Sequence, residues 1–461
     1  MKAADILSKA RTPFLRSSKI FDKIFLSPYF YLLLFAISCA ITIFGKEVAG
    51  AVAFVFIICI ALVLCEDIFA TTLPFMLLCV FITKCYNSYD TFIKFAWIAV
   101  PAVLSIVFHF VIYSKKIQIG STFYGLIGVS VALILGGIGT ISLSDYFRPV
   151  SLFYVGFLGI GMAIAYILLK SQMCSDRNYD ARAKLLAIFY IAGLLACVMI
   201  FKNVYDNRDF ILQYKKFSGY IQLQAKNNLS TFLMFAIPCP FFFASKNRLH
   251  IISPLVMLSA IILSQSRGGI IFGTIELLLC YILFAIVDKR NRYIYILIFS
   301  LAIIAAACFS KYILNIVLRK KSFSELINKN EDRYLLLSRA WIGFKQNPIF
   351  GHGIGYTGNT DIYNPKKGAM TWYHMIIPQI VGSLGSIGIL AYGYQFFARM
   401  KVVIKGVFTK DRILICALGM SYIGIVLMSQ VNPGLFCPFP YSLMTVMIFA
   451  LIDGNNLQKC A

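Results

Sequence analysis

The sequence predicts an all-α integral membrane protein with about 12–14 transmembrane helices and one large loop near residues 311–373. Composition is the first observation behind this prediction. Of 461 residues, 60% are hydrophobic and only 13% are charged, whereas soluble domains carry about 25% charged residues. The second observation is that apolar segments recur along the whole chain, and about 20 such residues suffice to span a bilayer. A single soluble core could not bury this much apolar surface, so most of it must face lipid.

Fourteen apolar segments are candidate spans, and some of them are short. We place them near 28–44, 48–64, 68–83, 91–113, 119–143, 150–169, 184–202, 229–245, 249–265, 268–287, 292–310, 374–398, 412–430 and 436–452. Residues 1–27 are basic and mildly amphipathic, and they lead directly into a full-length apolar segment, which is untypical of a cleavable signal peptide. We therefore expect a cytoplasmic lead-in at 1–27 and a single polytopic membrane domain at 28–461.

The distribution of positive residues predicts the orientation. Cytoplasmic loops of membrane proteins carry an excess of Lys and Arg. Short basic loops such as "SKNR" (245–248) and "DKRNR" (288–292) alternate with loops that are sparse in charge, such as "NPGLFCPFP" (432–440). Both termini are then predicted to be cytoplasmic. The long loops 203–228 and 311–373 are predicted to be extracytoplasmic.

The net charge of +24 does not indicate nucleic-acid binding, because most basic residues lie in short loops between apolar segments. The 13 cysteines are similarly uninformative. Many lie inside apolar segments, where cysteine behaves as a small hydrophobic residue, and no CxxC pair occurs. We expect neither a disulfide framework nor a cysteine metal site.

The motif "SRGG" places Arg267 where two apolar segments meet. An arginine close to lipid is costly, so it either extends its charge to the interface or has a function. The two glycines after it would allow a ligand to approach the backbone. The position predicts that Arg267 lies on the outer face.

Loop 311–373 is the second candidate region, since long loops in compact folds are often functional. Its segment 331–346 has apolar residues at roughly helical spacing, which predicts an amphipathic helix on the outer membrane surface. Asn347-Pro348 should end this helix, and "GHGIG" (351–355) should form a tight turn. His374 then opens a span in which glycines recur at 382, 385 and 388, a spacing that would let helices or a lipid tail approach closely.

Together these motifs resemble the O-antigen ligase and polymerase superfamily of bacterial envelopes. The resemblance rests on "SRGG", on "RYLLLSRAWIGFKQNPIFGHGIG", and on a histidine that opens a "GSLG" span, and it covers about 215–395. One departure is Leu337, at a position where that family often has tryptophan. The resemblance implies a glycosyltransferase of GT-C-like architecture in the bacterial inner membrane, with its active site on the extracytoplasmic face.

The same resemblance implies a donor and a reaction. The donor would be an oligosaccharide on polyprenyl (undecaprenyl) pyrophosphate, and a sugar hydroxyl of a glycan or lipid acceptor would attack it. Arg267 and Arg333 would hold the pyrophosphate, because arginine binds phosphate oxygens bidentately. Arg339 would bind substrate or face lipid headgroups. His374 would act as general base, with His352 as its competitor.

The basic loop 203–228 also carries aromatic residues, so it is either a solvated loop or a glycan-binding surface. Asn227 matches an asparagine that often opens a span in the family, and Lys226 beside it could reach a phosphate. We expect no metal and no other cofactor, because the acidic residues of the outer loops lack ligand-like spacing. These residues are Asp206, Asp209, Glu331, Asp332 and Asp361.

Four functions remain open at this stage. A polymerase would extend a lipid-linked O-antigen or capsule glycan, and this is the interpretation that we favour. A ligase would move a finished glycan to lipid A core or to a cell-wall acceptor. A transporter or flippase would use intramembrane charges such as Lys94 and Glu276, and a structural scaffold would need no chemistry. Apart from membrane lipids, other polysaccharide assembly proteins are partners by analogy only.

Overall fold

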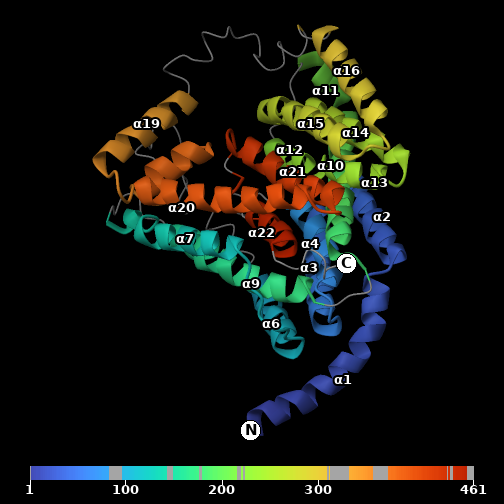
Figure 1. Ribbon diagram of the computed structural model, residues 1–461, viewed down its shortest axis with the longest axis vertical. Coiled ribbons are helices and arrows are strands. Elements are labelled where there is room, and N and C mark those ends of the chain that lie inside the picture. The colour runs from blue at the N-terminus through green and yellow to red at the C-terminus, as the bar shows by residue number, and fades with distance from the viewer. Residues whose placement is uncertain are drawn as a thin grey trace.

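The computed structural model describes most of the chain, and its elements are almost all helical (Figure 1). The described residues are 2–82, 96–142, 149–175, 179–214, 220–221, 224–308, 311, 332–356, 372–432, 434–436 and 440–453. The predicted site residues all fall within these ranges. Lys94, Glu331 and Asp361 lie outside them.

In the first half of the chain, the described residues form eleven helices. They are α1 (Lys2–Phe25), α2 (Pro28–Phe44), α3 (Glu47–Leu64), α4 (Phe69–Phe81), α6 (Ala96–Ile112), α7 (Thr122–Leu135) with η2 (Gly139–Ser142), α8 (Pro149–Gly156) with η3 (Phe157–Gly161), α9 (Met162–Met173) and α10 (Ala181–Asp206).

The second half contains a short strand pair and the remaining helices. They are α11 (Arg208–Tyr214), β1 (Tyr220–Ile221), β2 (Gln224–Ala225), α12 (Lys226–Ala236), α13 (Cys239–Ala244), η4 (Arg248–Ile252), α14 (Ser253–Leu263), α15 (Arg267–Val287), α16 (Arg292–Cys308), α19 (Asp332–Gln346), α20 (Ile376–Val407), α21 (Arg412–Ser429) and α22 (Pro440–Ile452).

The all-α membrane class is confirmed. Among the described residues, eight helical segments are long and apolar enough to cross a membrane, and a ninth span is possible if α1 and α2, bent by 59°, act as one. Five shorter apolar helices accompany them. Each of the fourteen segments predicted from the sequence contains a helix, although a few residues of five segments lie outside the described chain, namely 83, 91–95, 143, 309–310 and 437–439. The number of true spans stays a prediction.

Two departures concern the predicted loop 203–228. Helix α10 continues to Asp206, four residues past the predicted end of its span, and α11 follows at once. The loop then forms a two-residue antiparallel pair, with Tyr220 opposite Ala225. The Gln224 side chain is buried and donates to the carbonyls of Cys79 (2.8 Å) and Val80 (2.9 Å). It therefore supplies hydrogen-bond donors to two of the last carbonyls of α4, which have no partner within the helix.

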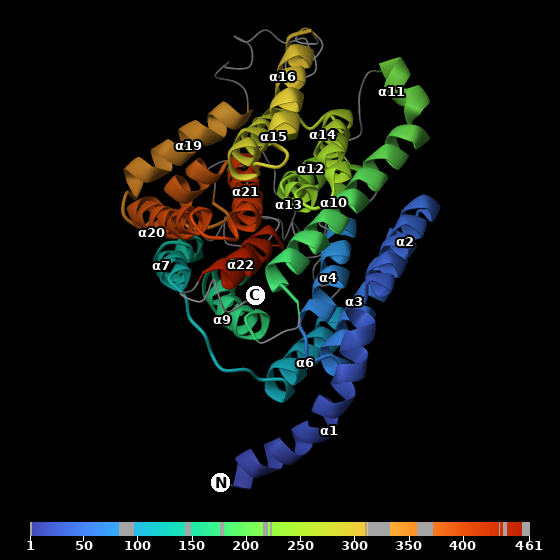
Figure 2. The same cartoon turned by 45° about the vertical axis from the view of Figure 1, so that its right-hand side comes forward.

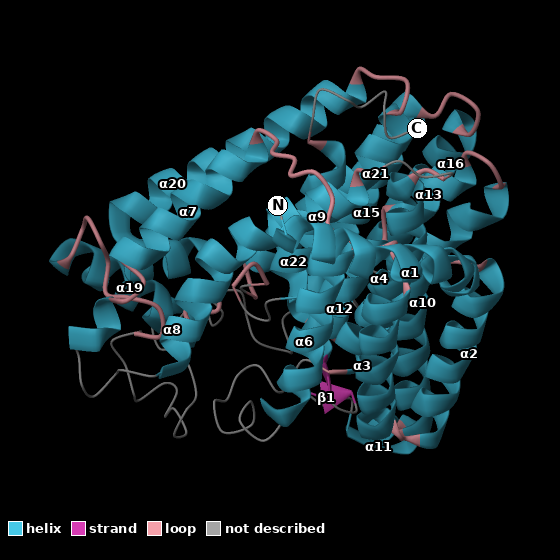
Figure 3. Cartoon of the chain, turned by 90° about the horizontal axis from the view of Figure 1, so that it is seen from below, coloured by secondary structure: helices cyan, strands magenta, loops and turns pink. Residues whose placement is uncertain are grey.

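The helices gather around two hydrophobic cores. The larger core joins α4, α9, α10, α12, α14, α15, α21 and α22. The smaller core lies between α7, α8 and α20 and includes Ile354, Trp372 and Phe436 from the connecting segments. Seen from below, α7, α8, α19 and much of α20 lie together on one side of the molecule, away from α2 and α10 (Figure 3). Helices α2 and α10 pack side by side on the opposite side of the molecule (Figure 2).

A buried carboxylate ties the end of α22 to the start of α7. Asp453 accepts hydrogen bonds from the backbone N–H of Ser121 (3.0 Å) and Thr122 (2.6 Å), and from both of their hydroxyls. The Tyr166 hydroxyl donates to the same carboxylate at 2.8 Å. Because the first N–H groups of a helix have no partner within the helix, Asp453 caps α7 from a distant part of the chain.

Candidate active site

The first candidate region is the N-terminus of α15, where Arg267 is the first helical residue. Ser266 is its N-cap, with an extended backbone and a hydroxyl that accepts from the N–H of Gly269 at 3.4 Å. Gln265 before it has a positive φ of 52°, which is uncommon for a residue other than glycine. The sharp turn between α14 and α15 therefore presents the half-buried Arg267 at the positive end of a 21-residue helix.

Helix α12 lies against this turn and brings a second predicted residue to it. The Ser266 hydroxyl donates to the side-chain oxygen of Asn227 at 2.8 Å. One turn later, the hydroxyls of Ser230 and Ser264 are 3.3 Å apart. A Cβ on Gly269 would lie 2.8 Å from Ser230, so the second glycine of "SRGG" is what permits this close approach. The motif and the asparagine that the sequence singled out separately are thus neighbours in space.

Lys226 is the first residue of α12 and is half-buried. Its carbonyl accepts from the Ser230 hydroxyl at 2.9 Å, so its backbone is held in the same cluster. Lys226 and Asn227 therefore stand at one helix N-terminus and Arg267 at another, and the Ser266–Asn227 bond joins the two helix ends. Two helix N-termini and two cations at one place favour a negatively charged ligand.

The second candidate region is the break in α20. Gly385 has φ 59° and ψ −151°, so the helix is interrupted there. Segment 347–355 fills the break with its own backbone: His352 N–H donates to the Gly382 carbonyl (3.0 Å) and Gly353 N–H to the Ser383 carbonyl (2.9 Å). In return, Ser386 N–H donates to the Pro348 carbonyl at 2.8 Å. The "NPIFGHGIG" and "GSLG" motifs therefore satisfy each other's backbone groups.

This arrangement gives the glycines of α20 a more specific role than the predicted helix or lipid packing. A Cβ on Gly385 would lie 2.6 Å from the Ile349 carbonyl oxygen. A Cβ on Gly382 would lie 2.8 Å from the ring of Tyr373. The glycines leave room for segment 347–355 and for an aromatic ring, both from this protein.

Helix α19 confirms the predicted helix in the long loop, and it ends at Gln346, directly before Asn347-Pro348. Its buried residues Leu336 and Ala340 pack against Tyr373, the residue before His374. Arg339 lies near the Tyr373 hydroxyl. Burial raises the pKa of Tyr373, and the positive charge of Arg339 opposes that rise. The packing therefore brings Arg339 toward the segment that carries His374.

Arg333 lies in the first turn of α19 and is exposed. It is six residues from Arg339, which is half-buried, so the two arginines differ in burial. Leu337, Trp341 and Ile342 are also exposed, so the apolar face of α19 is only partly covered by α20.

His374 lies between Tyr373 and the start of α20 and is half-buried, with a positive φ of 56°. A residue other than glycine in this conformation is strained, and such strain is often found at functional sites. The buried Gln379 holds the segment in place: its side-chain oxygen accepts from Tyr373 N–H at 3.0 Å, and its amide donates to Ser383 at 2.8 Å. The His374 backbone is therefore fixed by the helix that follows it.

His352 occupies a different place from His374. Its ring packs against Gly343 of α19 and lies 5.0 Å from the ring of Tyr356. Its Nε2 atom is enclosed and has no hydrogen-bond partner among the residues that the structure describes. Burial lowers the pKa of His352, with a hydrogen bond to the Gly343 backbone acting in the opposite sense. The ring is therefore neutral near pH 7, and it packs against α19 from its own segment, 347–355.

The structure thus groups the predicted residues around two centres, with Asn227, Lys226 and Arg267 in one and Arg339 and His374 in the other. Helix α21 packs against both α15 and α20 and connects them. Sequence reasoning overlooked Ser266, Tyr373 and Gln379. Ser266 had a readable signal, because serine before a helical segment is a common N-cap, whereas Tyr373 and Gln379 were indistinguishable from core residues.

Within the described ranges, no group of three or more His, Cys, Asp or Glu side chains is arranged to hold a metal ion. Two of the acidic residues considered above have basic neighbours: Asp206 pairs with Lys202, and Asp209 lies 3.8 Å from Arg208.

The fold and these helix ends define a class of protein, a multi-pass all-α membrane protein with cationic and polar residues gathered at the N-termini of its helices. Residues 252–393 match the profile of the O-antigen ligase family, which supports the resemblance of this part of the chain to the O-antigen ligase and polymerase superfamily. The match supports a glycosyl-transfer enzyme acting on lipid-linked glycans. A comparison with curated proteins found no match. The matched range contains five of the seven predicted site residues, namely Arg267, Arg333, Arg339, His352 and His374.

Proposed function

We propose that the protein transfers a glycan from a polyprenyl (undecaprenyl) pyrophosphate donor to a sugar hydroxyl at the extracytoplasmic face of the inner membrane, as a polysaccharide polymerase. The observation that carries the proposal is the family match over 252–393, which includes both "SRGG" and the segment from α19 to His374. The acceptor hydroxyl would attack the anomeric carbon, and the bond from that carbon to the pyrophosphate oxygen would break. The pyrophosphate leaves with the bonding electrons and gains negative charge.

Arg267 is proposed to stabilise that leaving group. The guanidinium belongs to the first residue of α15, so the helix dipole and the free N–H groups of the first turn add to its positive charge. Small residues surround it, because Ser266 precedes it and two glycines follow. Lys226 and Asn227 are proposed to bind the phosphates or the first sugar from the adjoining end of α12.

Arg333 and Arg339 are proposed to act from α19 on the glycan or on the second phosphate. The exposed Arg333 would reach substrate from the first turn of the helix, and Arg339 would do so beside Tyr373. Fixed cations can stabilise a departing pyrophosphate by themselves, which is why we propose a metal-independent reaction.

His374 is proposed to take the proton from the attacking hydroxyl. A positioned neutral imidazole typically contributes about 10²–10⁴-fold in rate. The strained backbone at His374 and the Gln379 contacts that fix it suit a group that must be held in one orientation. His352 is the less suitable base, because its only unpaired ring nitrogen is enclosed.

A ligase that transfers a finished glycan to lipid A core or to a wall acceptor would use the same residues and differ only in the acceptor. One assay separates the two. The purified protein in nanodiscs receives a polyprenyl-pyrophosphate oligosaccharide with EDTA present and no other acceptor, and the products are separated on a gel. A ladder of longer glycans indicates a polymerase, and transfer that requires an added lipid or wall acceptor indicates a ligase.

The variants Arg267→Ala, Arg333→Ala and His374→Ala test the residues. We expect losses of about 10²–10³-fold for the arginines and about 10²–10⁴-fold for the histidine. Arg290→Ala and His250→Ala, in or beside the predicted cytoplasmic loops, are matched controls outside the proposed site and should keep wild-type activity. Full activity in all three site variants would refute the assignment, and activity that appears only with an added divalent cation would refute metal independence. A lack of transfer under every condition would favour the transporter interpretation.

A further inference from the structure

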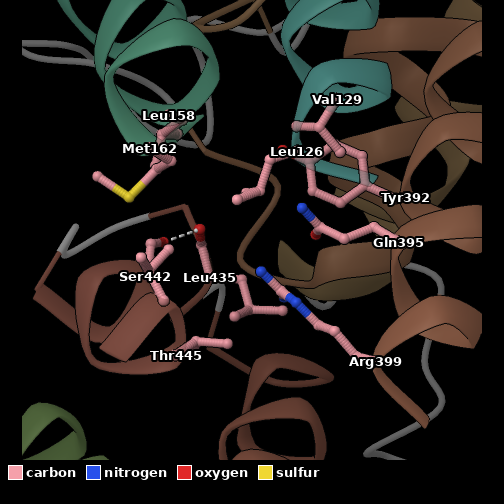
Figure 4. A pocket seen from close by; sticks show the side chains of 11 residues that line it. Leu126, Val129, Leu158, Met162, Tyr392, Gln395, Arg399, Leu435, Ser442 and Thr445 are labelled. Carbon is pink, nitrogen blue, oxygen red and sulfur yellow. Dashed lines mark hydrogen bonds between the residues drawn. The ribbon is translucent and has the colours of Figure 1, made fainter. Parts of the chain in front are cut away.

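A small cavity lies inside the helix bundle, away from the proposed active site. It has a volume of about 30 Å³, is partly open, and is lined by residues of α7, α9, α20 and α22 (Figure 4). The walls from α7, η3 and α9 are apolar and are formed by Leu126, Val129, Leu158 and Met162. The wall from α20 is polar. Because a water-sized molecule needs about 10–15 Å³ of such volume, the cavity has room for a ligand of one or two heavy atoms.

Arg399 of α20 points into this cavity (Figure 4) and is only 5% exposed. Its guanidinium lies 5.4 Å from the ring centre of Tyr422 and 5.2 Å from that of Phe449. Within the described ranges, its Nε atom has no hydrogen-bond partner. In the part of the chain that the structure describes, the ion pairs involve other basic residues, and none provides a carboxylate for Arg399.

Arg182 is also buried, but unlike Arg399 it has carboxylate partners. Its side chain is 1% exposed, and it pairs with Asp180 at 3.1 Å and with Asp411 at 2.9 Å. Arginine remains charged at any relevant pH, and a buried charge without a counter-charge costs several kcal/mol, roughly. Arg182 is neutralised by this protein's own carboxylates, whereas Arg399 faces a cavity instead.

Two further polar side chains share this face of α20. Tyr392 and Gln395 lie seven and four residues before Arg399, a spacing that places all three on one side of the helix. Gln395 is 6% exposed, and its amide points toward the cavity (Figure 4). On the opposite wall, the hydroxyls of Ser442 and Thr445 already donate to the carbonyls of Leu435 (2.6 Å) and Tyr441 (2.8 Å). The α20 wall thus offers a cation and an amide donor to whatever occupies the cavity.

We propose that this cavity binds a small monovalent anion of halide size, with chloride as the natural occupant, held by Arg399 and Gln395. The anion supplies the negative charge that Arg182 receives from aspartates. The apolar walls lower the local dielectric and so strengthen the electrostatic attraction. The volume selects for size, because a phosphate group with its four oxygens exceeds it. Occupancy would stabilise the junction of α7, α20 and α22, independently of the proposed glycosyl transfer.

The test measures thermal stability of the full-length protein in detergent as sodium gluconate is replaced by sodium chloride or bromide at constant ionic strength. A ligand that binds only the folded state raises its stability in a saturable way. We expect a saturable rise in apparent melting temperature with both halides. Gln395→Leu keeps the side-chain volume and the guanidinium, and should shift the half-saturating halide concentration upward about tenfold, as expected for one lost hydrogen bond to a charge. Arg399→Gln should abolish the response.

Gln430→Leu is the matched control, since Gln430 is the C-cap of α21, lies outside the cavity, and donates from its amide to the backbone carbonyl of Val426 in that helix. It should keep the wild-type halide response. Equilibrium binding of ³⁶Cl⁻ to the wild type and to Gln395→Leu gives a second readout that does not depend on whether Arg399→Gln folds. The proposal is overturned if the wild type shows no halide dependence, or if Gln395→Leu and Arg399→Gln respond like the wild type. Stabilisation by inorganic phosphate or a phosphate diester in place of chloride would also overturn the halide assignment.

Discussion

Substituting Gly385 by alanine should separate segment 347–355 from α20. The backbone at Gly385, with φ 59° and ψ −151°, belongs to a region that only glycine adopts readily, so alanine costs about 1–3 kcal/mol in strain. The new Cβ would also lie 2.6 Å from the Ile349 carbonyl oxygen and 2.8 Å from the Gly351 nitrogen. These are backbone atoms, so the whole segment must move.

That movement weakens the backbone hydrogen bonds across the break, each worth about 0.5–1.5 kcal/mol. If two of them are lost, the total loss is roughly 2–6 kcal/mol when the strain is included. We expect the apparent melting temperature in detergent to fall by roughly 2–6 °C, because an unfolding entropy of about 2.1 cal/mol/K per residue makes 1 kcal/mol worth about 1 °C in a chain of 461 residues. His352 should also become more accessible, because its N–H is bonded to the Gly382 carbonyl across this break.

Gly393→Ala is the control on the same helix. A Cβ at Gly393 would meet nothing within 4 Å, and the residue has no positive φ. Alanine in a helix interior is favoured over glycine by about 0.5–1 kcal/mol, so this variant should be unchanged or slightly more stable. Thermal unfolding of both variants checks the expectation. Equal stability of Gly385→Ala and Gly393→Ala would refute the role given to the break.

Three further predictions concern helix ends. Ser266→Ala removes an N-cap and the partner of Asn227, and should destabilise the protein by about 1–2 kcal/mol in thermal unfolding; a larger loss of activity than of stability would tie the cap to the proposed site. Asp453→Asn should lower the melting temperature, because the carboxylate accepts several hydrogen bonds, and Asp453→Ala should lower it further; wild-type stability in both would contradict the capping role. Burial alone would raise the pKa of Asp453, but the hydrogen bonds from Thr122, Ser121 and Tyr166 lower it overall. A lowered folded-state pKa means that this stabilisation is present at neutral pH and is lost as the pH falls through that pKa, so the Asp453→Asn variant should show a weaker loss of stability on acidification.

Much of the architecture could be predicted from local patterns. Apolar length alone located the fourteen helical segments, and the Asn347-Pro348 pair correctly ended α19 because proline and its predecessor disfavour helix. The meeting of two helices at Arg267 followed from the apolar segments on either side of the "SRGG" motif. These features depend on neighbours in the sequence, which is why they were readable.

The break in α20 could not be predicted from the sequence. Nothing in the spacing of Gly382 and Gly385 shows that one has a positive φ, or that a segment some thirty residues earlier fills the gap. Arg399 was overlooked for a related reason, since it appeared to belong to a basic loop after the predicted end of its span at 398. The structure continues α20 to Val407 and buries Arg399 against rings from α21 and α22. Both cases depend on contacts between distant segments.

The cap on α7 imposes an order on biogenesis. Ser121 and Asp453 are separated by 332 positions, which a ribosome traverses in roughly 20–60 s at about 5–20 residues per second. During that interval the first N–H groups of α7 lack their final acceptor, and α7 must wait in the membrane for the last helix to be inserted. Truncation shortly before Asp453 should therefore impair assembly of the α7 side of the bundle, near residue 121 and more than 300 positions away in the sequence.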